Sequence, residues 1–289
     1  MSHAIRPRRS VLYMPGSNAR ALEKAKTLPA DGYILDLEDA VSPDAKETAR
    51  DQVCAAVSGG GYGKRELIIR VNGLDTPWGG DDLVAAARAR PDAVLLPKVE
   101  SARMVSDARA ALRAYGGGDI PIWCMMETPM GILHAEEIAA SGVACFVMGT
   151  SDLTKDLHAQ HTRMRLPMLT SLSLCLLAGR AYGLSILDGV YLDLSDEEGF
   201  RESCRQGLEL GFDGKTLIHP KQVAPANEVF APDADKIAYS RRIIEAYEKA
   251  LAEGQGIVVV DGKLIENLHV EDARRLVALD DAIRAMAED

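Results

Sequence analysis

Short apolar segments recur along the first 220 residues and predict eight buried strands. Between most of them, apolar residues recur at helical spacing among good helix formers. A strand and a helix that alternate eight times predict an α/β protein whose parallel sheet closes into a (β/α)8 barrel, the TIM barrel. The expected strands are residues 10–14, 32–37, 66–71, 93–96, 122–126, 145–148, 184–187 and 214–218, and the expected helices include residues 19–27, 43–57, 83–89, 102–114, 134–140, 168–182 and 196–210.

An open, doubly wound sheet is the competing topology for the same alternation. Its nucleotide-binding members carry a Gly-x-Gly-x-x-Gly turn directly after the first strand. Here the glycine-rich segment Gly59–Gly63 follows a predicted helix and resembles a linker. The closed barrel is therefore the favoured fold.

Residues 221–289 exceed what eight strand–helix units need. Residues 232–254 and 270–287 have helical patterns, and residues 256–268 form two apolar runs around Asp261-Gly262, a preferred tight-turn pair. We expect a barrel domain at residues 1–220 and a helix–hairpin–helix extension at residues 221–289. The extension would be a lid that reaches its own site or a neighbouring subunit's site.

Each predicted strand leads into polar or ionisable residues at its carboxyl end, the face where barrel enzymes build their active sites. Such residues at all eight ends predict an active site on that face. In strand order they are Pro15-Gly16-Ser17, Glu38-Asp39, Arg70 with Asn72, Pro97-Lys98, Glu127, Thr150-Ser151-Asp152, Asp188 and His219-Pro220.

Glu127 ends a buried apolar strand, and Asp152 follows the next strand. Neighbouring strands lie about 5 Å apart, so the two carboxylates should face each other across the barrel mouth. They repel unless a cation lies between them or one is protonated. Mg²⁺ fits such a pair, because two protein oxygens leave room for water and substrate; Mn²⁺ remains open. A metal-free ion pair with Arg70 or Lys98 is the alternative.

Glu38 and Asp39 are candidates for holding metal-bound waters. Arg70 lies in a buried run, where an unpaired guanidinium would be very costly. We expect it to face the mouth and to clamp a carboxylate or polarise a carbonyl of the substrate. A purely structural ion pair with Glu38 or Asp39 is the alternative.

Composition and charge narrow the possible partners. The formal net charge of −10 argues against nucleic-acid binding, which needs a basic face. The basic segment Ile5–Ser10, with Arg20, Lys24 and Lys26 soon after, forms either a solvated arm or a site for an anionic small molecule. No apolar run approaches the ~20 residues of a membrane span, and no signal-peptide pattern is present. Five scattered cysteines without a C-x-x-C pair predict a reduced, cytoplasmic protein.

Several of these segments together resemble the citrate lyase β-subunit-like family, also called the HpcH/HpaI aldolase group. The matches run from residue 9 to about residue 270. They are RSVLYMPGSNARALEKA, DLEDAV, RVNG, LLPKVE, METPMG, GTSDLTKDL, GKTLIHPKQ and DGKLIENL. The resemblance implies a Mg²⁺-dependent TIM barrel that acts on acyl-CoA esters of hydroxy acids and assembles as a homotrimer or homohexamer.

The resemblance also implies roles for individual residues. Glu127 and Asp152 would be the Mg²⁺ ligands. Arg70 and Glu127 would bind the substrate, Arg70 at its carbonyl or carboxylate, and Glu38 and Asp39 would support the metal shell.

The loop that follows the first strand has an implied role as well. Pro15, Gly16 and Lys24, with the basic segment before them, would contribute to the CoA site.

One position departs from the family pattern. Family lyases carry in the hairpin an Asp that reaches the neighbouring subunit's site as the acid/base for C–C cleavage, whereas this chain has Glu266. The extra methylene moves the carboxylate roughly 1.5 Å, and a misplacement near 1 Å can cost on the order of 100-fold in a positioned reaction. Glu266 is thus a poor acid/base for a lyase but could activate water against a thioester carbonyl.

We therefore expect the chain to resemble the thioesterases of the malyl-CoA branch, which hydrolyse (S)-malyl-CoA to malate and CoA. Arg70 and Glu266 would be the catalytic residues. The first alternative is a lyase that splits malyl-CoA or a citramalyl-type analogue into an acyl-CoA and an oxo acid. A catalytically idle barrel that binds acyl-CoA is the third possibility.

Overall fold

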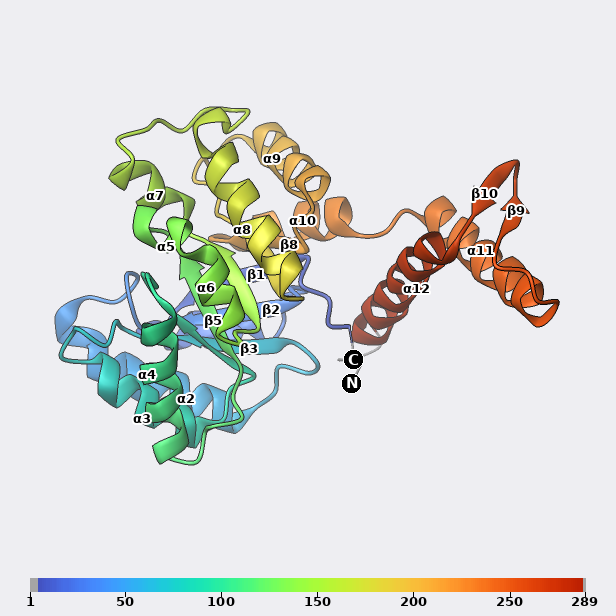
Figure 1. Ribbon diagram of the computed structural model, residues 1–289. Helices are drawn as coiled ribbons and strands as arrows, with labels where there is room; N and C mark the ends of the chain where they lie inside the picture. Colours follow the sequence, from blue (N-terminus) through green and yellow to red (C-terminus); the bar gives the residue numbers. More distant parts are fainter. Residues whose placement is uncertain (1–4, 288–289) are drawn as a thin grey trace. The chain divides into compact units, whose positions relative to one another are not determined.

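The computed structural model describes residues 5–287, and its main feature is a closed barrel of eight parallel strands (Figure 1). The strands follow one another around the barrel in sequence order, and β1 closes it by pairing with β8. They are β1 (Ser10–Pro15), β2 (Gly32–Asp36), β3 (Glu66–Arg70), β4 (Ala93–Leu96), β5 (Ile122–Met126), β6 (Cys145–Met148), β7 (Ser185–Asp188) and β8 (Gly214–Leu217). The predicted TIM barrel is confirmed.

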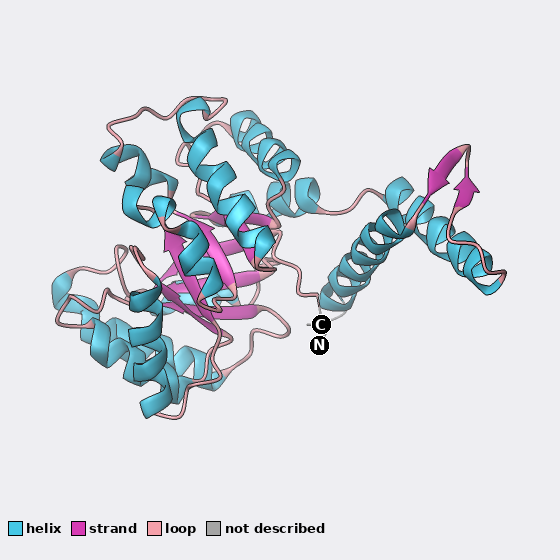
Figure 2. Cartoon of the chain, in the orientation of Figure 1, coloured by secondary structure: helices cyan, strands magenta, loops and turns pink. Residues whose placement is uncertain are grey.

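Helices surround the strands, as the cyan and magenta elements in Figure 2 show. They are α1 (Ala19–Ala25), α2 (Lys46–Gly59), α3 (Gly79–Ala89), α4 (Ala102–Ala114), α5 (Pro129–Leu133), α6 (Ala135–Ala140), α7 (Thr150–Asp156), α8 (Leu169–Ala181), α9 (Glu197–Leu210) and α10 (Val223–Phe230). Short 3₁₀ turns lie at η1 (Pro43–Ala45), η2 (Leu166–Met168) and η3 (Pro220–Gln222).

Side chains alternate along each strand between the barrel interior and the helix layer. The interior cluster includes Val11, Ile34, Ile68 and Trp123, all fully buried. The intervening positions pack with the helices in a second, larger core. Residues two positions further along β1, β2, β3 and β5 therefore form the next interior layer towards the carboxyl ends of the strands.

The structure adds three helices, α5, α7 and α10, to those named from the sequence. β6 ends at Met148, as predicted, and the polar residues that follow it begin the helix α7 at Thr150. The helix α10 contains Pro225, which an α-helix tolerates in its first turn.

The chain divides into two compact units, one of which spans Arg8–Phe230. This division lies ten residues beyond the expected boundary at residue 220. The reason is α10, which packs against α9, β1 and β8 and so belongs with the barrel.

The second compact unit contains the C-terminal segment from Ala231 onward. It is built from α11 (Ala234–Ala252), a hairpin of β9 (Val258–Val260) and β10 (Lys263–Ile265), and α12 (Asn267–Ala287). The hairpin turns at Asp261 and Gly262, which both have positive φ angles, 50° and 78°, as this tight turn requires. This confirms the predicted order of helix, hairpin and helix. None of the helices within residues 5–287 has the length and apolar character to cross a membrane.

Candidate active site

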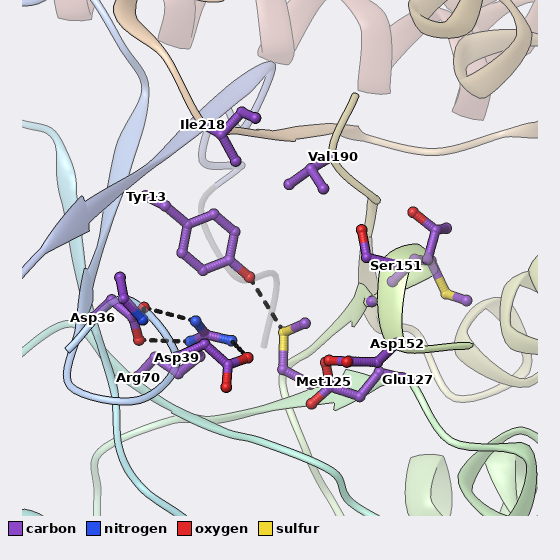
Figure 3. A pocket seen from close by; sticks show the side chains of 14 residues that line it. Tyr13, Asp36, Asp39, Arg70, Met125, Glu127, Ser151, Asp152, Val190 and Ile218 are labelled. Carbon is purple, nitrogen blue, oxygen red and sulfur yellow. Dashed lines mark hydrogen bonds and ion pairs between the residues drawn. The ribbon is translucent and has the colours of Figure 1, made fainter. Parts of the chain in front are cut away.

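A cavity of about 340 Å³ lies at the carboxyl ends of the strands, and Figure 3 shows the side chains around it. All of its lining residues come from the barrel unit. They are Tyr13, Asp36, Asp39, Ala40, Arg70, Met125, Glu127, Met148, Gly149, Thr150, Ser151, Asp152, Val190 and Ile218.

The strand alternation explains which of these side chains face the cavity. Tyr13, Asp36, Arg70 and Met125 each lie two residues after an interior core residue of the same strand. Glu127 lies two residues further along than Met125, just beyond the end of β5. The floor of the cavity is thus the uppermost interior layer of the barrel.

Arg70 is held mainly by Asp36, its register partner on β2. Its Nε and Nη2 atoms donate to the two carboxylate oxygens at 2.7 and 2.6 Å, a bidentate pair. Burial by itself would lower the pKa of Arg70, but its anionic partners, Asp36 before Glu38, together outweigh burial and hold the pKa well above its ordinary value. The guanidinium therefore stays charged beneath the cavity.

Arg70 has further partners besides Asp36. Its Nη1 lies 2.9 Å from Glu38 Oε2 and 3.6 Å from Asp39, and its guanidinium lies 5.0 Å from the ring centre of Tyr13. The alternative ion pairs with Glu38 and Asp39 are thus present beside the principal pair. The sequence interpretation missed Asp36; the signal that could have found it is a carboxylate inside the otherwise apolar run GYILDL.

Glu127 is almost completely buried, at 1% exposure. Its Oε1 accepts a hydrogen bond from the backbone N–H of Lys98 at 2.7 Å. Gly149 packs against this side chain so closely that a Cβ there would lie 2.3 Å from Glu127 Cβ. Burial raises the pKa of Glu127 to about 7, so its charged form requires a compensating cation.

Asp152 lies in the first turn of α7, and Figure 3 shows its side chain beside that of Glu127. Its charge contributes to the raised pKa of Glu127. The structure thus brings together the two carboxylates that were expected to meet.

These two carboxylates fit Mg²⁺. Within residues 5–287, no group of three or more His, Cys, Asp or Glu side chains is arranged to hold a metal. A cation here would depend on two carboxylates and on water or substrate oxygens. Mg²⁺ accepts this combination, whereas a structural zinc site needs four protein ligands.

Glu38 contacts Arg70 but is not among the residues that line the cavity. It bridges two cations, since one oxygen contacts Arg70 and the other accepts from Lys98 Nζ. Burial raises the pKa of Glu38 although both cations oppose the shift. Asp39 lines the cavity and also a second hollow of about 590 Å³, which Glu38 and Lys98 line as well.

Pro15, Gly16 and Lys24 lie outside the lining of the cavity. Gly16 has no room for a side chain, because a Cβ would lie 2.6 Å from the carbonyl oxygen of Asp36. Its own N–H donates to that oxygen at 2.8 Å, which fixes the start of the loop. Lys24 is exposed on α1.

Glu266 is exposed at the start of α12, in the second compact unit. Its carbonyl accepts from the N–H groups of His269 and Val270, and its N–H donates to His269 Nδ1. The residues that line the cavity do not include it.

Two other strand ends do not supply cavity residues. His219 is exposed, and its Nδ1 accepts from the N–H of Lys221. Asp188 is fully buried between the sheet and α9, where it pairs with Lys215 Nζ at 2.8 Å and Arg165 Nη1 at 2.6 Å. The expectation that polar groups from all eight strand ends gather at the mouth was therefore wrong for these two residues, because the polar groups of Asp188 and His219 are satisfied elsewhere.

A family model described as HpcH/HpaI aldolase/citrate lyase matches residues 9–220. The chain belongs to this family. A (3S)-malyl-CoA thioesterase of Cereibacter sphaeroides is 50% identical over 286 residues, which cover 99% of both chains.

Other family members carry different names. An L-malyl-CoA/beta-methylmalyl-CoA lyase of Cereibacter sphaeroides is 36% identical over 97% of this chain and 96% of that protein. Among solved structures, the CitE protein of Mycobacterium tuberculosis in complex with magnesium, acetoacetate and coenzyme A is 28% identical, with a TM-score of 0.75. The match covers 94% of this chain and 97% of that chain. The HpcH/HpaI family thus includes proteins named as thioesterases and as lyases, and one member crystallised with magnesium.

Proposed function

We propose that the protein is a (3S)-malyl-CoA thioesterase, which adds water to the thioester of (S)-malyl-CoA and releases malate and CoA. The observation that carries this proposal is the 50% identity to a (3S)-malyl-CoA thioesterase over 99% of both chains. The cavity agrees with it, since it joins a buried cation, two adjacent carboxylates and a volume suited to a small acyl group.

In this proposal Glu127 and Asp152 hold Mg²⁺, which would supply a positive charge for the oxygens of the hydroxy-acid group. Mn²⁺ would fit the same oxygen donors. The buried carboxylate of Glu127 and the magnesium in the Mycobacterium tuberculosis structure support this assignment. Glu38 and Asp39 are proposed to support the metal site through Arg70, which both contact.

Arg70 is proposed to stabilise negative charge on the substrate carbonyl. It remains charged, it lines the cavity, and Asp36 fixes its orientation through two hydrogen bonds. A donor fixed in advance stabilises a developing oxyanion without reorganising during the reaction.

Glu266 is proposed to activate the attacking water, in its own or a neighbouring subunit's site. Pro15, Gly16 and Lys24 are proposed to contact CoA. The extension at residues 221–289 would act as the lid, and the assembly would be a homotrimer or homohexamer. The free cysteines fit a reduced, cytoplasmic setting.

Lyase chemistry is the second candidate, favoured by the 36% identity to an L-malyl-CoA/beta-methylmalyl-CoA lyase. The two reactions give different products from the same substrate. Hydrolysis yields malate and a free CoA thiol, whereas cleavage of the C–C bond yields acetyl-CoA and glyoxylate.

Incubation of the purified protein with (S)-malyl-CoA and Mg²⁺ separates the candidates. We expect a free thiol and malate in equal amounts, measured by a thiol reagent and by chromatography. Glyoxylate and acetyl-CoA without free CoA would reject the thioesterase assignment. Intact substrate would instead favour a barrel that only binds acyl-CoA.

A further inference from the structure

Ser151 precedes Asp152 in the first turn of α7 and lines the cavity. Figure 3 shows its side chain on the side of the cavity where Val190 lies, next to Asp152. Its Oγ is buried and has no hydrogen-bond partner among residues 5–287. A buried hydroxyl without a partner is uncommon, because leaving one unpaired costs free energy.

The helix itself does not satisfy this hydroxyl. One turn later, Thr154 Oγ1 donates to the carbonyl of Thr150, four residues earlier, at 2.6 Å. The residue four positions before Ser151 is Val147, which still belongs to strand β6. The usual local acceptor for a helical hydroxyl is therefore missing at Ser151.

Two other donors that line the cavity, Arg70 and Tyr13, have partners. Arg70 donates to Asp36 and contacts Glu38, and the Tyr13 hydroxyl donates to Met125 Sδ at 3.4 Å. The Ser151 hydroxyl thus remains available for an acceptor that arrives with the substrate.

We propose that Ser151 is a substrate-binding residue that donates a hydrogen bond to the free carboxylate of the hydroxy-acid end. This inference rests on the proposed function, which places that end of the substrate beside Asp152, the neighbour of Ser151. The carboxylate distinguishes malyl-CoA from 3-hydroxybutyryl-CoA, which has a methyl group at that position. Ser151 therefore favours thioesters of hydroxydicarboxylic acids.

The test compares the wild type, Ser151→Ala and the control Ser58→Ala, a serine on α2 outside the cavity lining. A hydrogen bond to a charged acceptor predicts that Ser151→Ala raises KM for malyl-CoA by about 10- to 100-fold. Because this contact binds substrate and transition state alike, kcat stays within about 3-fold of the wild type. Ser58→Ala should change neither constant.

Calorimetry supplies a readout that does not depend on turnover. In the presence of Mg²⁺, Ser151→Ala should weaken (S)-malate binding by a similar factor and leave Mg²⁺ affinity unchanged. Unchanged KM and malate affinity would overturn the inference. A parallel loss of Mg²⁺ affinity would also overturn it, because Ser151 would then act by positioning Asp152.

The same measurements separate this inference from the proposed function. A wild-type protein that binds malate but does not hydrolyse malyl-CoA would reject the thioesterase, and the malate affinity of Ser151→Ala would still decide the role of Ser151. A wild-type protein that binds no malate would reject both.

Discussion

Glu127 and Arg70 both line the cavity, but their charges are balanced in different ways. Arg70 meets Asp36 in a bidentate pair and Glu38 at 2.9 Å. Glu127 accepts one backbone hydrogen bond, from Lys98, and has Asp152 beside it. Because two neighbouring carboxylates repel, the pair of Glu127 and Asp152 is the part of the site that needs a bound cation.

Replacing Glu127 by Gln should therefore remove Mg²⁺ binding while preserving the shape of the site. We expect the affinity to fall by more than about 100-fold, because losing a group that merely orients a ligand already costs about 10- to 100-fold. Titration calorimetry with Mg²⁺ measures the change. Glu100→Gln, an exposed residue of the second hollow, is the control and should bind Mg²⁺ normally. Full affinity or full turnover of Glu127→Gln would contradict the metal assignment.

At the scale of elements, Gly149 determines how closely the end of β6 approaches Glu127. A Cβ at Gly149 would lie 2.3 Å from Glu127 Cβ and 2.5 Å from Oε2, so the two segments would have to separate. We expect Gly149→Ala to lower the free energy of unfolding by about 1 to 3 kcal/mol, as overpacking does. It should also weaken Mg²⁺ binding.

The matched control is Gly80→Ala in α3, where nothing lies within 4 Å of the added Cβ. Because alanine favours the helix, this control should gain stability, by up to about 1 kcal/mol. Urea unfolding of both variants provides the comparison. A Gly149→Ala protein with wild-type stability and Mg²⁺ affinity would show that the packing there is loose.

The pair of Asp188 on β7 and Lys215 on β8 is fully buried, and Arg165 connects it to the segment before α8. Burial would raise the pKa of Asp188, but Lys215 and Arg165 outweigh burial and hold the pKa below its ordinary 3.8. A lowered carboxyl pKa stabilises the folded state above pH 3.8, and this stabilisation is lost as the pH falls through the lower, folded-state pKa.

We therefore expect Lys215→Met to lower the free energy of unfolding at pH 7 by about 3 kcal/mol, since removing one partner leaves a buried charge poorly compensated. The difference from the wild type should shrink below about pH 4, as Asp188 becomes protonated. Urea unfolding at several pH values measures both. Lys249→Met, which removes an exposed ion pair, is the control and should change little. A difference that is independent of pH would contradict this assignment.

The apolar runs predicted the strands because each barrel strand is buried on both faces, and strand order then placed Glu127, Asp152 and Arg70 at one end. The pattern of apolar residues within one strand could not show that Asp36 pairs with Arg70, because that pairing depends on the register between two strands. They also could not show that Asp188 faces α9 while Glu127 faces the cavity, since both end apolar runs.

At the scale of the whole molecule, the extension has its own small core but leaves apolar residues exposed. Val259 and Leu264 are register partners in the hairpin and are 64% and 51% exposed, and Leu268 is 61% exposed. Exposed apolar groups gathered in this way often mark a protein interface. A second copy of the chain would suit this surface and could receive Glu266 in its active site.

Co-expression of two inactive variants tests whether Glu266 serves a neighbouring subunit. Glu127→Gln disables one cavity and Glu266→Ala removes the proposed base, so each alone should hydrolyse little malyl-CoA. Glu266→Ala should nevertheless retain CoA binding.

We assume that equal amounts of the two variants assemble at random around a symmetric ring. About one quarter of all sites then combine an intact Glu127 with an intact Glu266 from the neighbouring chain. We therefore expect about one quarter of wild-type turnover in the mixture. Turnover no higher than that of the separate variants would mean that Glu266 acts within its own chain or not at all, and loss of CoA binding in Glu266→Ala would make the hairpin structural.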